Sequence, residues 1–421
     1  MVEKEEVLKA HSGGKIEVIS KVPTDSVRDL SIYYTPGVAY VSEEIAHNRE
    51  RVYDYTSKGN TIAIISDGTR ILGLGDLGPY AAMPVMEGKA LLFKKFGGVD
   101  AVPICVDTKD EAEIVRLVKD IAPTFGGINI EDIKSPRCIT IAERLSKEID
   151  VPVLHDDRQG TGVVVLAAAI NAVKLAGKDR NARIVINGAG AAGYGILERL
   201  HHYGFRNIIV VDTKGAIFAG RAENDDLKER IASMTNPQKL AGSLHEVVAG
   251  ADMLIGVSSR GAFTREDISK MASKPIIFAL ANPYPEISYA EAREAGAYIV
   301  ATGRSDTPNQ VNNLLAFPGL MRGMLDIRAK ALNDEMLDAA SMAISKGVGK
   351  RLSPEYIIPG ILEKSHVTRV VPDVAAAVAE AGMRTGQARV MVAKEQVRKH
   401  AKELLKRYGR IERKAIGVRR V

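Results

Sequence analysis

The residues best suited to chemistry in the middle of this chain are a set of glycines followed by an acid. The glycines form the pattern G-x-G-x-x-G directly after a β-branched run, and the acid ends a second apolar run 22 residues beyond the middle glycine. Glycines let the backbone approach a pyrophosphate, the following helix N-terminus attracts its charge, and the acid accepts hydrogen bonds from a ribose diol. We predict a dinucleotide site here. Its contacts would be Gly188, Gly190, Ala191, Ala192, Gly193 and Asp212.

Two acidic pairs could hold a metal ion. Glu131-Asp132 and Asp156-Asp157 each follow a short apolar run. In open α/β sheets, ligands bind just beyond the carboxyl ends of the strands. Carboxylates without clustered His or Cys suit a hard ion, Mg²⁺ or Mn²⁺. Acids after strands also serve as helix N-caps, so spacing alone leaves both interpretations open.

Several single residues could take part in catalysis or binding, although each also has an ordinary structural explanation. Lys89 lies in a largely apolar stretch. Loss of hydration there would lower its pKa and let it act as a base, whereas a surface lysine would fit the same stretch. Tyr34 adjoins a Thr-Pro-Gly turn signal. Asn282 and Asn313 stand beyond apolar runs, where an asparagine can bind a carboxylate or cap a turn.

A second G-x-G-x-x-G pattern at 73–78 does not fit a nucleotide loop. Pro79 follows it directly, and Lys95 rather than an acid stands 20 residues beyond its middle glycine. We predict a turn there, which could line a pocket together with Arg70.

The elements that must position these residues alternate between strands and helices. Helices are predicted at 110–122, 136–149 (with Ser135 as N-cap and Pro136 as first residue), 160–175, 329–345 and 388–408. Strands are predicted at 128–130, 151–154, 184–186, 208–211, 253–257, 276–280 and 298–301. This alternation predicts an α/β fold: a first α/β domain, a Rossmann-type doubly wound parallel sheet, and C-terminal helices. The expected divisions are 1–159, 160–387 and 388–421.

Composition narrows the class of protein. The 421 residues are 46% hydrophobic, no apolar run is long enough to predict a membrane span, and the start lacks the apolar segment of a signal peptide. Two cysteines form no redox or disulfide pattern, so we expect a cytoplasmic protein. The net charge is +6, but the chain from Lys394 onward has a surplus of eight positive charges, which leaves the remainder near −2. This distribution of charge argues against nucleic acid as a partner of the chain before Lys394. The basic end could contact RNA, a membrane surface or an acidic partner, although a solvated terminal helix explains it more simply.

Seven motifs stand in order along the chain. They are Y-T-P-G-V at 34–38, S-D-G-T-R-I-L-G-L-G-D-L-G at 66–78, E-G-K-A-L-L-F at 87–93, I-E-D at 130–132, H-D-D-R-Q-G-T at 155–161, N-G-A-G-A-A-G at 187–193 and N-P at 282–283. Together they resemble the malic enzyme family in its short prokaryotic form. The resemblance extends from about Ser31 to Gly323 and rests on the five longer motifs.

The resemblance implies metal-dependent oxidative decarboxylation of L-malate to pyruvate and CO₂ with reduction of NAD(P), and decarboxylation of oxaloacetate as a further activity. It implies Tyr34 as general acid and Lys89 as general base, with Asp156 supporting Lys89. A base must be neutral, so the pKa of Lys89 is expected to be lowered by burial and the nearby ion. The implied ligands of Mg²⁺ or Mn²⁺ are Glu131, Asp132 and Asp157. The implied malate contacts are Arg70, Asn282 and Asn313, with Asn282 also near the nicotinamide and Asn312 a weaker choice than Asn313.

The family resemblance also bears on cofactor, assembly and domains. Asp212 favours NAD because a 2′-phosphate would meet its carboxylate, and Lys214 could counter that charge and allow NADP. A homodimer or higher oligomer is expected. Residues 1–159 would form the catalytic domain, 160–387 the NAD(P)-binding domain and 388–421 a basic helix or tail.

Three other functions compete with this one. A malolactic enzyme would make lactate from malate without net NADH. A plain malate dehydrogenase would stop at oxaloacetate, but such enzymes use a His–Asp pair, and no histidine here is well placed for that. A non-catalytic nucleotide-binding module with a basic docking tail would not need Tyr34, Lys89 or the acidic pairs.

Overall fold

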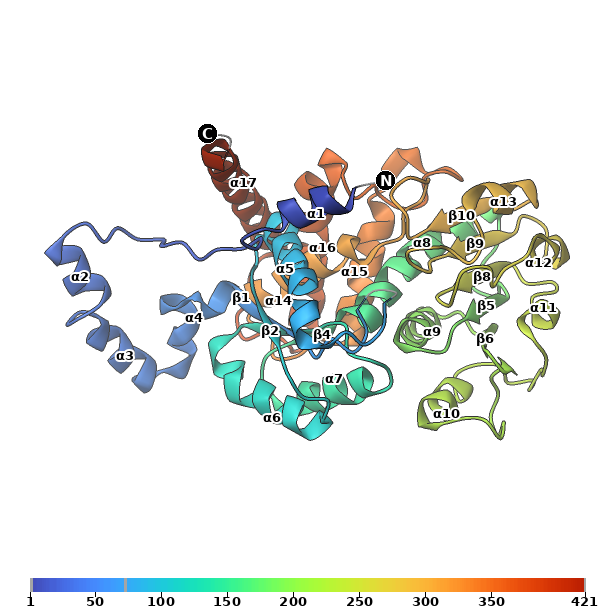
Figure 1. The fold of residues 1–421 in the computed structure, drawn as a ribbon, viewed down its shortest axis with the longest axis horizontal. Helices are drawn as coiled ribbons and strands as arrows, with labels where there is room; N and C mark the ends of the chain where they lie inside the picture. Colours follow the sequence, from blue (N-terminus) through green and yellow to red (C-terminus); the bar gives the residue numbers. More distant parts are fainter. Residues whose placement is uncertain (1–2, 72–73, 420–421) are drawn as a thin grey trace.

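Two sheets, joined by one long helix, make up the body of the protein (Figure 1). The structure, a computed structural model, describes residues 3–71 and 74–419. Two features of the sequence therefore fall partly outside the described residues: Leu72 and Gly73, at the start of the second glycine pattern, and the last two residues of the basic end.

The first sheet has four parallel strands in the order β2-β1-β3-β4. They are β1 (Thr61–Ser66), β2 (Asp100–Cys105), β3 (Gly127–Ile130) and β4 (Val153–His155). The connecting helices are α5 (Gly78–Gly97), α6 (Glu111–Ile121) and α7 (Arg137–Glu148). Because crossovers between parallel strands are right-handed, the strand order puts α5 on one face and α6 and α7 on the other. Every residue of β1 and β3 is buried, as expected for strands covered on both faces.

The second sheet has the Rossmann-type order β10-β9-β8-β5-β6-β7. Its strands are β5 (Ile184–Asn187), β6 (Ile208–Asp212), β7 (Gly215–Ala216), β8 (Met253–Gly256), β9 (Ile276–Ala279) and β10 (Ile299–Thr302). Only β7 is antiparallel within this sheet, as part of a tight hairpin with β6. The associated helices are α9 (Ala191–Tyr203), α10 (Asp226–Ala232), α11 (Leu244–Val247), α12 (Arg265–Lys270) and α13 (Tyr289–Glu294). From β5 the chain adds β6 on one side and then β8, β9 and β10 on the other. This change of direction leaves a crevice for a ligand beyond the carboxyl ends of β5 and β8.

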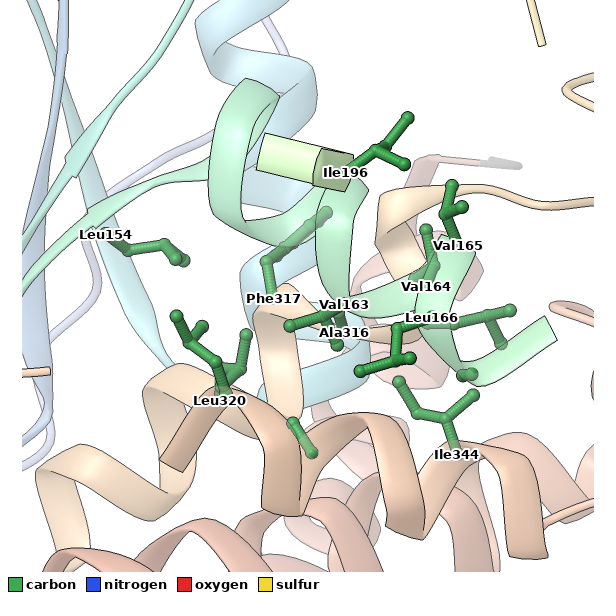
Figure 2. Packing of buried hydrophobic residues seen from close by; sticks show 14 of the residues in the cluster. Leu154, Val163, Val164, Val165, Leu166, Ile196, Ala316, Phe317, Leu320 and Ile344 are labelled. Carbon is green, nitrogen blue, oxygen red and sulfur yellow. The ribbon is translucent and has the colours of Figure 1, made fainter. Parts of the chain in front are cut away.

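A buried helix and the C-terminal helices hold the two sheets together. Helix α8 (Thr161–Ala176) continues a π-helical turn, η4 (Asp156–Gly160). The other helices are α14 (Phe317–Asp326), α15 (Asp334–Lys346), α16 (Val371–Arg384) and α17 (Lys394–Arg419). Figure 2 shows Val163 and Leu166 of α8 near Phe317 and Leu320 of α14 and Ile344 of α15. Helices α14 and α17 also pack on α5, so the chain returns to the first sheet after completing the second.

By length and composition alone, the helical segment Asp156–Ala176 could cross a membrane. Within it, 72% of the most apolar window is buried inside the protein. Burial of that extent is typical of the core helix of a folded domain.

Part of the N-terminal segment stands apart from this body, although Lys15 hydrogen-bonds Glu87 of α5 and Asp54 forms an ion pair with Arg328. It contains α1 (Lys4–Ala10), α2 (Val27–Tyr33), α3 (Val38–His47) and α4 (Val52–Tyr55). Helices α2 and α3 project to the left of the body in Figure 1. All their residues are exposed or partly exposed, although several are large and apolar. We call residues 18–47 the N-terminal arm.

The predicted α/β class with a Rossmann-type sheet and C-terminal helices is confirmed, but some element boundaries were wrong. Pro136 is the N-cap of α7 rather than its first residue, because its carbonyl accepts the first helical hydrogen bonds. Helix α15 begins at Asp334, where Asn333 caps it, rather than at 329. Helix α17 is longer than predicted and begins at Lys394.

Candidate active site

Three carboxylates from two neighbouring loops form the acidic centre of the site. Glu131 and Asp132 follow β3, and Asp157 lies in the π-helical turn after β4, so adjacent parallel strands deliver all three to one edge of the sheet. One oxygen from each lies within 4.8 Å of the others. The backbone N–H of Asp132 donates to Asp157 Oδ2 at 3.2 Å, which fixes the two loops relative to each other. The acidic pairs therefore do not act merely as separate helix caps.

The chemistry of this set fits a divalent cation. Burial and the nearby Asp157 raise the pKa of Asp132 to about 7. Burial also raises the pKa of Glu131 well above its usual value, against the opposing effect of Lys89. Crowded, poorly hydrated carboxylates of this kind are relieved by a positive charge, and hard oxygen donors suit Mg²⁺ or Mn²⁺.

Lys89 lies beside this centre, on the buried side of α5. Its Nζ lies 2.6 Å from Asp156 Oδ2 and 2.7 Å from Glu131 Oε1, and 4.4 Å from the centre of the Phe317 ring. Only 10% of its side chain is exposed. Lys89 is therefore a buried cation between two carboxylates and not a surface lysine.

Burial acts on the Lys89 pKa in the expected direction, but two neighbouring carboxylates act in the opposite direction. Burial alone would lower it, but the charges and hydrogen bonds of Asp156 and Glu131 outweigh burial and raise the pKa above its ordinary value. The sequence showed the apolar surroundings of Lys89 but not that two carboxylates from other strands would contact its amine. These contacts favour the protonated amine of Lys89, and Asp156 and Glu131 are the groups closest to accept its proton.

The asparagines and Arg70 occupy different positions around the centre. Asn313 Nδ2 donates to Asp156 Oδ2 at 2.6 Å, so it joins the Lys89 cluster, whereas the side chain of Asn312 caps a short turn. Arg70 is exposed, and its backbone N–H donates to the carbonyl of Asp132 at 3.0 Å. Asn282 is exposed on the loop after β9, against Gly303. Arg70 therefore lies at the rim of the acidic centre, and Asn282 lies at the carboxyl edge of the second sheet.

Tyr34 is not brought to this cluster within the chain. It directly follows α2 in the N-terminal arm and is 70% exposed. Figure 1 shows α2 projecting from the body, well away from α5 and β4, which carry the cluster. The structure therefore joins Lys89, Asp156, Asn313 and the three acidic ligands, but leaves Tyr34 apart from them.

The first glycine pattern forms the turn from β5 into α9. A Cβ on Gly193 would lie 1.8 Å from the carbonyl oxygen of Gly188, and one on Gly188 would lie 2.7 Å from that of Val257, so both positions require glycine. A Cβ on Gly190 would meet nothing within 4 Å. Gly190 is the N-cap of α9 and, lacking a side chain, leaves the helix N-terminus uncapped. This open, electropositive turn fits a pyrophosphate, with Ala191 and Ala192 in the first turn of α9.

Asp212 ends β6, where the ribose of a dinucleotide would lie, but it is already paired. Arg221 donates to both of its oxygens, at 2.9 and 2.6 Å, and Lys228 Nζ lies 3.4 Å from Oδ2. Lys214, the expected counter-charge, contacts Asp212 through its backbone N–H. The cations that neutralise Asp212 are thus Arg221 and Lys228, which sequence spacing did not indicate.

Two further polar residues were missed by sequence reasoning. Asn129, within β3, donates to Glu131 Oε2 at 2.8 Å and so orients a carboxylate of the centre. An amide in an otherwise apolar strand was the available signal. Arg158 hydrogen-bonds Glu143 of α7 at 3.1 Å and Glu198 of α9 at 2.7 Å, and thereby ties the two sheets together next to Asp157. It lies inside a recognised motif, but its partners are distant in sequence.

These features define an enzyme of the dinucleotide-dependent class, with a buried lysine and a carboxylate metal centre beside the nucleotide sheet. Comparison with protein families identifies the malic enzyme N-terminal domain at residues 13–146 and the malic enzyme NAD-binding domain at 158–383. The chain belongs to the malic enzyme family.

Individual relatives agree with this assignment and differ in their cofactors. The chain is 52% identical to the bifunctional malic/malolactic enzyme of Bacillus subtilis, over 95% of this chain and 98% of that protein. It is 44% identical to an NADP-dependent malic enzyme of Rhizobium meliloti, over 91% of this chain and 53% of that longer protein. The crystal structure of malic enzyme from Pyrococcus horikoshii superimposes with a TM-score of 0.93 at 46% identity, covering 97% of each chain.

Proposed function

We propose that the protein oxidises and decarboxylates L-malate to pyruvate and CO₂ with reduction of NAD or NADP, and that it also decarboxylates oxaloacetate. The observation that carries this proposal is the buried Lys89, which lies between Asp156 and Glu131 and next to a cluster of three carboxylates. That cluster lies at the edge of the first sheet, and Arg158 connects it to the helix of the glycine turn. A malate bound between the two sheets would have its reacting carbon within reach of Lys89 and of a nicotinamide held on the second sheet.

The acidic cluster would hold Mg²⁺ or Mn²⁺ through Glu131, Asp132 and Asp157. When bound, the ion would act as a Lewis acid on substrate oxygens, and the nicotinamide would accept hydride. Asn129 keeps the Glu131 carboxylate oriented, because its amide holds one of the two oxygens. Substitution of a single ligand would weaken metal binding.

Lys89 is the proposed base for the C2 hydroxyl of malate. To accept that proton its amine must first become neutral, and Asp156 is the adjacent proton acceptor at 2.6 Å. Asn313 donates to the same oxygen of Asp156 and would hold the carboxyl in place as its charge changes. Arg70, at the rim, is the proposed partner of a malate carboxylate, for which a guanidinium offers paired hydrogen-bond donors.

We further propose that the protein is a homodimer in which the N-terminal arm of one subunit delivers Tyr34 to the site of the other. The arm exposes Val27 at 82%, Tyr40 at 72% and Tyr34 at 70%, a large apolar surface for a free monomer. A second copy of this chain is the occupant proposed for that surface, because Tyr34 belongs to a family motif and yet lies away from its own Lys89. Tyr34 would then protonate C3 after CO₂ leaves.

Mixed dimers test this arrangement. Tyr34→Phe and Lys89→Ala should each be inactive, but co-expression should restore activity, because half of the dimers would combine one intact Tyr34 with one intact Lys89. With random pairing, about a quarter of wild-type activity is expected. If Tyr34 acts within its own subunit, every site in the mixture carries a defect and no activity returns.

The reaction itself is tested by incubating the protein with L-malate, Mn²⁺ and NAD or NADP while following reduced cofactor, pyruvate and lactate together. Equal amounts of pyruvate and reduced cofactor are expected. Lactate without reduced cofactor would instead identify the malolactic reaction, a second candidate that the name of the Bacillus subtilis relative favours. Oxaloacetate without pyruvate would contradict the proposed role of the metal cluster.

A further inference from the structure

Glu286 is a fully buried carboxylate at the carboxyl edge of the second sheet. Its Oε1 accepts the backbone N–H of Ser258 at 2.7 Å and the hydroxyl of Ser258 at 3.1 Å. Its Oε2 accepts the backbone N–H of Ala281 at 3.1 Å. Ser258 lies in the loop after β8 and Ala281 in the loop after β9, so one carboxylate fastens two neighbouring loops to each other.

The same set of contacts reaches the glycine turn. Asn187, the last residue of β5, donates from Nδ2 to the Ser258 hydroxyl at 2.9 Å, and this hydroxyl donates to Glu286. Asn187 directly precedes Gly188, against which the carbonyl of Val257 packs too closely for a Cβ. Glu286 therefore connects, through Ser258, the ends of three strands that surround the crevice of this sheet.

The charge of Glu286 is not explained by an ion pair. No lysine, arginine or histidine nitrogen lies within 4.0 Å of its carboxylate in the part of the chain that the structure describes. A buried charge without a counter-ion is costly for a fold, and such groups gather at functional sites. Gly256, the last residue of β8, leaves the room that the carboxyl needs, because a Cβ there would lie 2.4 Å from Glu286 Cδ. A role in holding the loops accounts for this charge better than packing does.

The loops that Glu286 fastens lead directly to the proposed contacts of the cofactor. Asn282, the proposed contact of malate and the nicotinamide, immediately follows Ala281. The glycine turn has an anchor of its own, since the N–H of Gly188 donates to the carbonyl of Val211 at 2.9 Å. Loss of Glu286 would therefore disturb the loops at the nicotinamide end more than the turn that fits the pyrophosphate.

We propose that Glu286 is a positioning residue for the nicotinamide half of the cofactor. It keeps the loops after β8 and β9 at the spacing that Asn282 and the nicotinamide require, without touching the cofactor itself. The adenine and pyrophosphate half depends on it less. This inference rests on the proposed function for the place of the nicotinamide, but it concerns binding and can be tested without malate.

The test compares NADH with ADP-ribose, which carries the same adenosine, pyrophosphate and second ribose but no nicotinamide. Dissociation constants are measured by calorimetry. In Glu286→Gln, an NH₂ group replaces one acceptor and meets a backbone N–H, so one loop loses its anchor. We expect this variant to weaken NADH by at least about tenfold and ADP-ribose by less than about twofold. Ser258→Ala removes only the hydroxyl and should weaken NADH by about threefold.

Asp267→Asn is the matched control. Asp267 is also buried on this sheet, at 1% exposure, but its partners are Thr264 and His245 rather than Ser258 and Ala281. This substitution should lower the melting temperature, as Glu286→Gln should, but leave the ratio of the two dissociation constants unchanged. The ratio thus separates positioning of the nicotinamide from a general loss of stability.

Three outcomes would overturn the inference. They are a folded Glu286→Gln protein with unchanged affinity for NADH, an equal loss for NADH and ADP-ribose, and an Asp267→Asn protein with the same selective loss as Glu286→Gln. If Glu286→Gln fails to fold, Ser258→Ala decides, and unchanged NADH binding in that variant overturns the inference. Absence of malate turnover together with the expected selective loss would refute the proposed function and leave this inference standing.

Discussion

Replacement of Lys89 by alanine should change both catalysis and stability, and the two effects can be measured separately. The substitution removes a buried ammonium that lies 2.6 Å from Asp156 and 2.7 Å from Glu131, and leaves both carboxylates in a nearly dry site. Loss of one partner from a buried ion pair costs about 3–5 kcal/mol, so the free energy of unfolding measured in denaturant without added metal should fall by that amount. Loss of a general base should lower kcat by about 10²–10⁴-fold.

The dissociation constant of NADH should stay the same in this variant, because the glycine turn lies on the other sheet. Addition of Mn²⁺ should restore part of the stability, since the ion replaces the missing positive charge, but should not restore turnover. The matched control is Lys95→Ala, on the same helix, where the ion pair with Glu412 is exposed and worth at most about 1 kcal/mol. Wild-type kcat in Lys89→Ala would refute the assignment of Lys89 as the base, and wild-type stability would refute the argument from the buried ion pair.

Three further perturbations test other parts of the site and fold. Asp157→Asn should raise the Mn²⁺ concentration needed for half-maximal activity at least about tenfold, and an unchanged titration would remove Asp157 from the ligand set. Gly190→Ala should weaken NADH binding without a change in melting temperature, because its Cβ points into open space. Gly193→Ala should lower the melting temperature, because its Cβ would clash with Gly188. Equal effects of the two substitutions would contradict this geometry. Burial lowers the pKa of His366 below its ordinary value of 6.5, so the unfolded chain binds the extra proton first and stability should fall as the pH drops below about 6.5. His366→Gln should make the melting temperature less sensitive between pH 7.5 and 5.5, and a pH dependence equal to that of the wild type would exclude this role.

Sequence patterns anticipated those parts of the protein in which local rules and tertiary packing agree. In the glycine turn, backbone carbonyl groups come so close to Gly188 and Gly193 that neither position has room for a Cβ. Acids that directly follow neighbouring parallel strands had to meet at one edge of the sheet, as Glu131 and Asp157 do. The strands themselves were recognisable because runs covered on both faces are almost wholly apolar.

The remaining features depend on contacts between distant segments, which no local pattern encodes. The pKa of Lys89 is set by carboxylates 42 and 67 positions away, and Asp212 is neutralised by a loop residue rather than by the nearby Lys214. Helix α16 was not predicted, although it is rich in alanine and valine and largely buried, as is α8, which was predicted. The position of Tyr34 follows from the arm as a whole and could not be inferred from its motif.

The return of α14 to the first sheet limits how this chain can be divided into fragments that fold independently. A cut near residue 160 would not yield two self-sufficient fragments, because α14 and α17 pack on α5 although they follow the entire second sheet in the chain. The first fragment would leave the side of α5 that contacts α14 and α17 without its cover, and the second would expose Phe317 and its apolar neighbours to water. Chimeras that exchange the nucleotide-binding half between relatives should therefore exchange residues 184–302 and keep residues from 313 onward with the first sheet. Helices α14 and α17 would then remain with the α5 on which they pack.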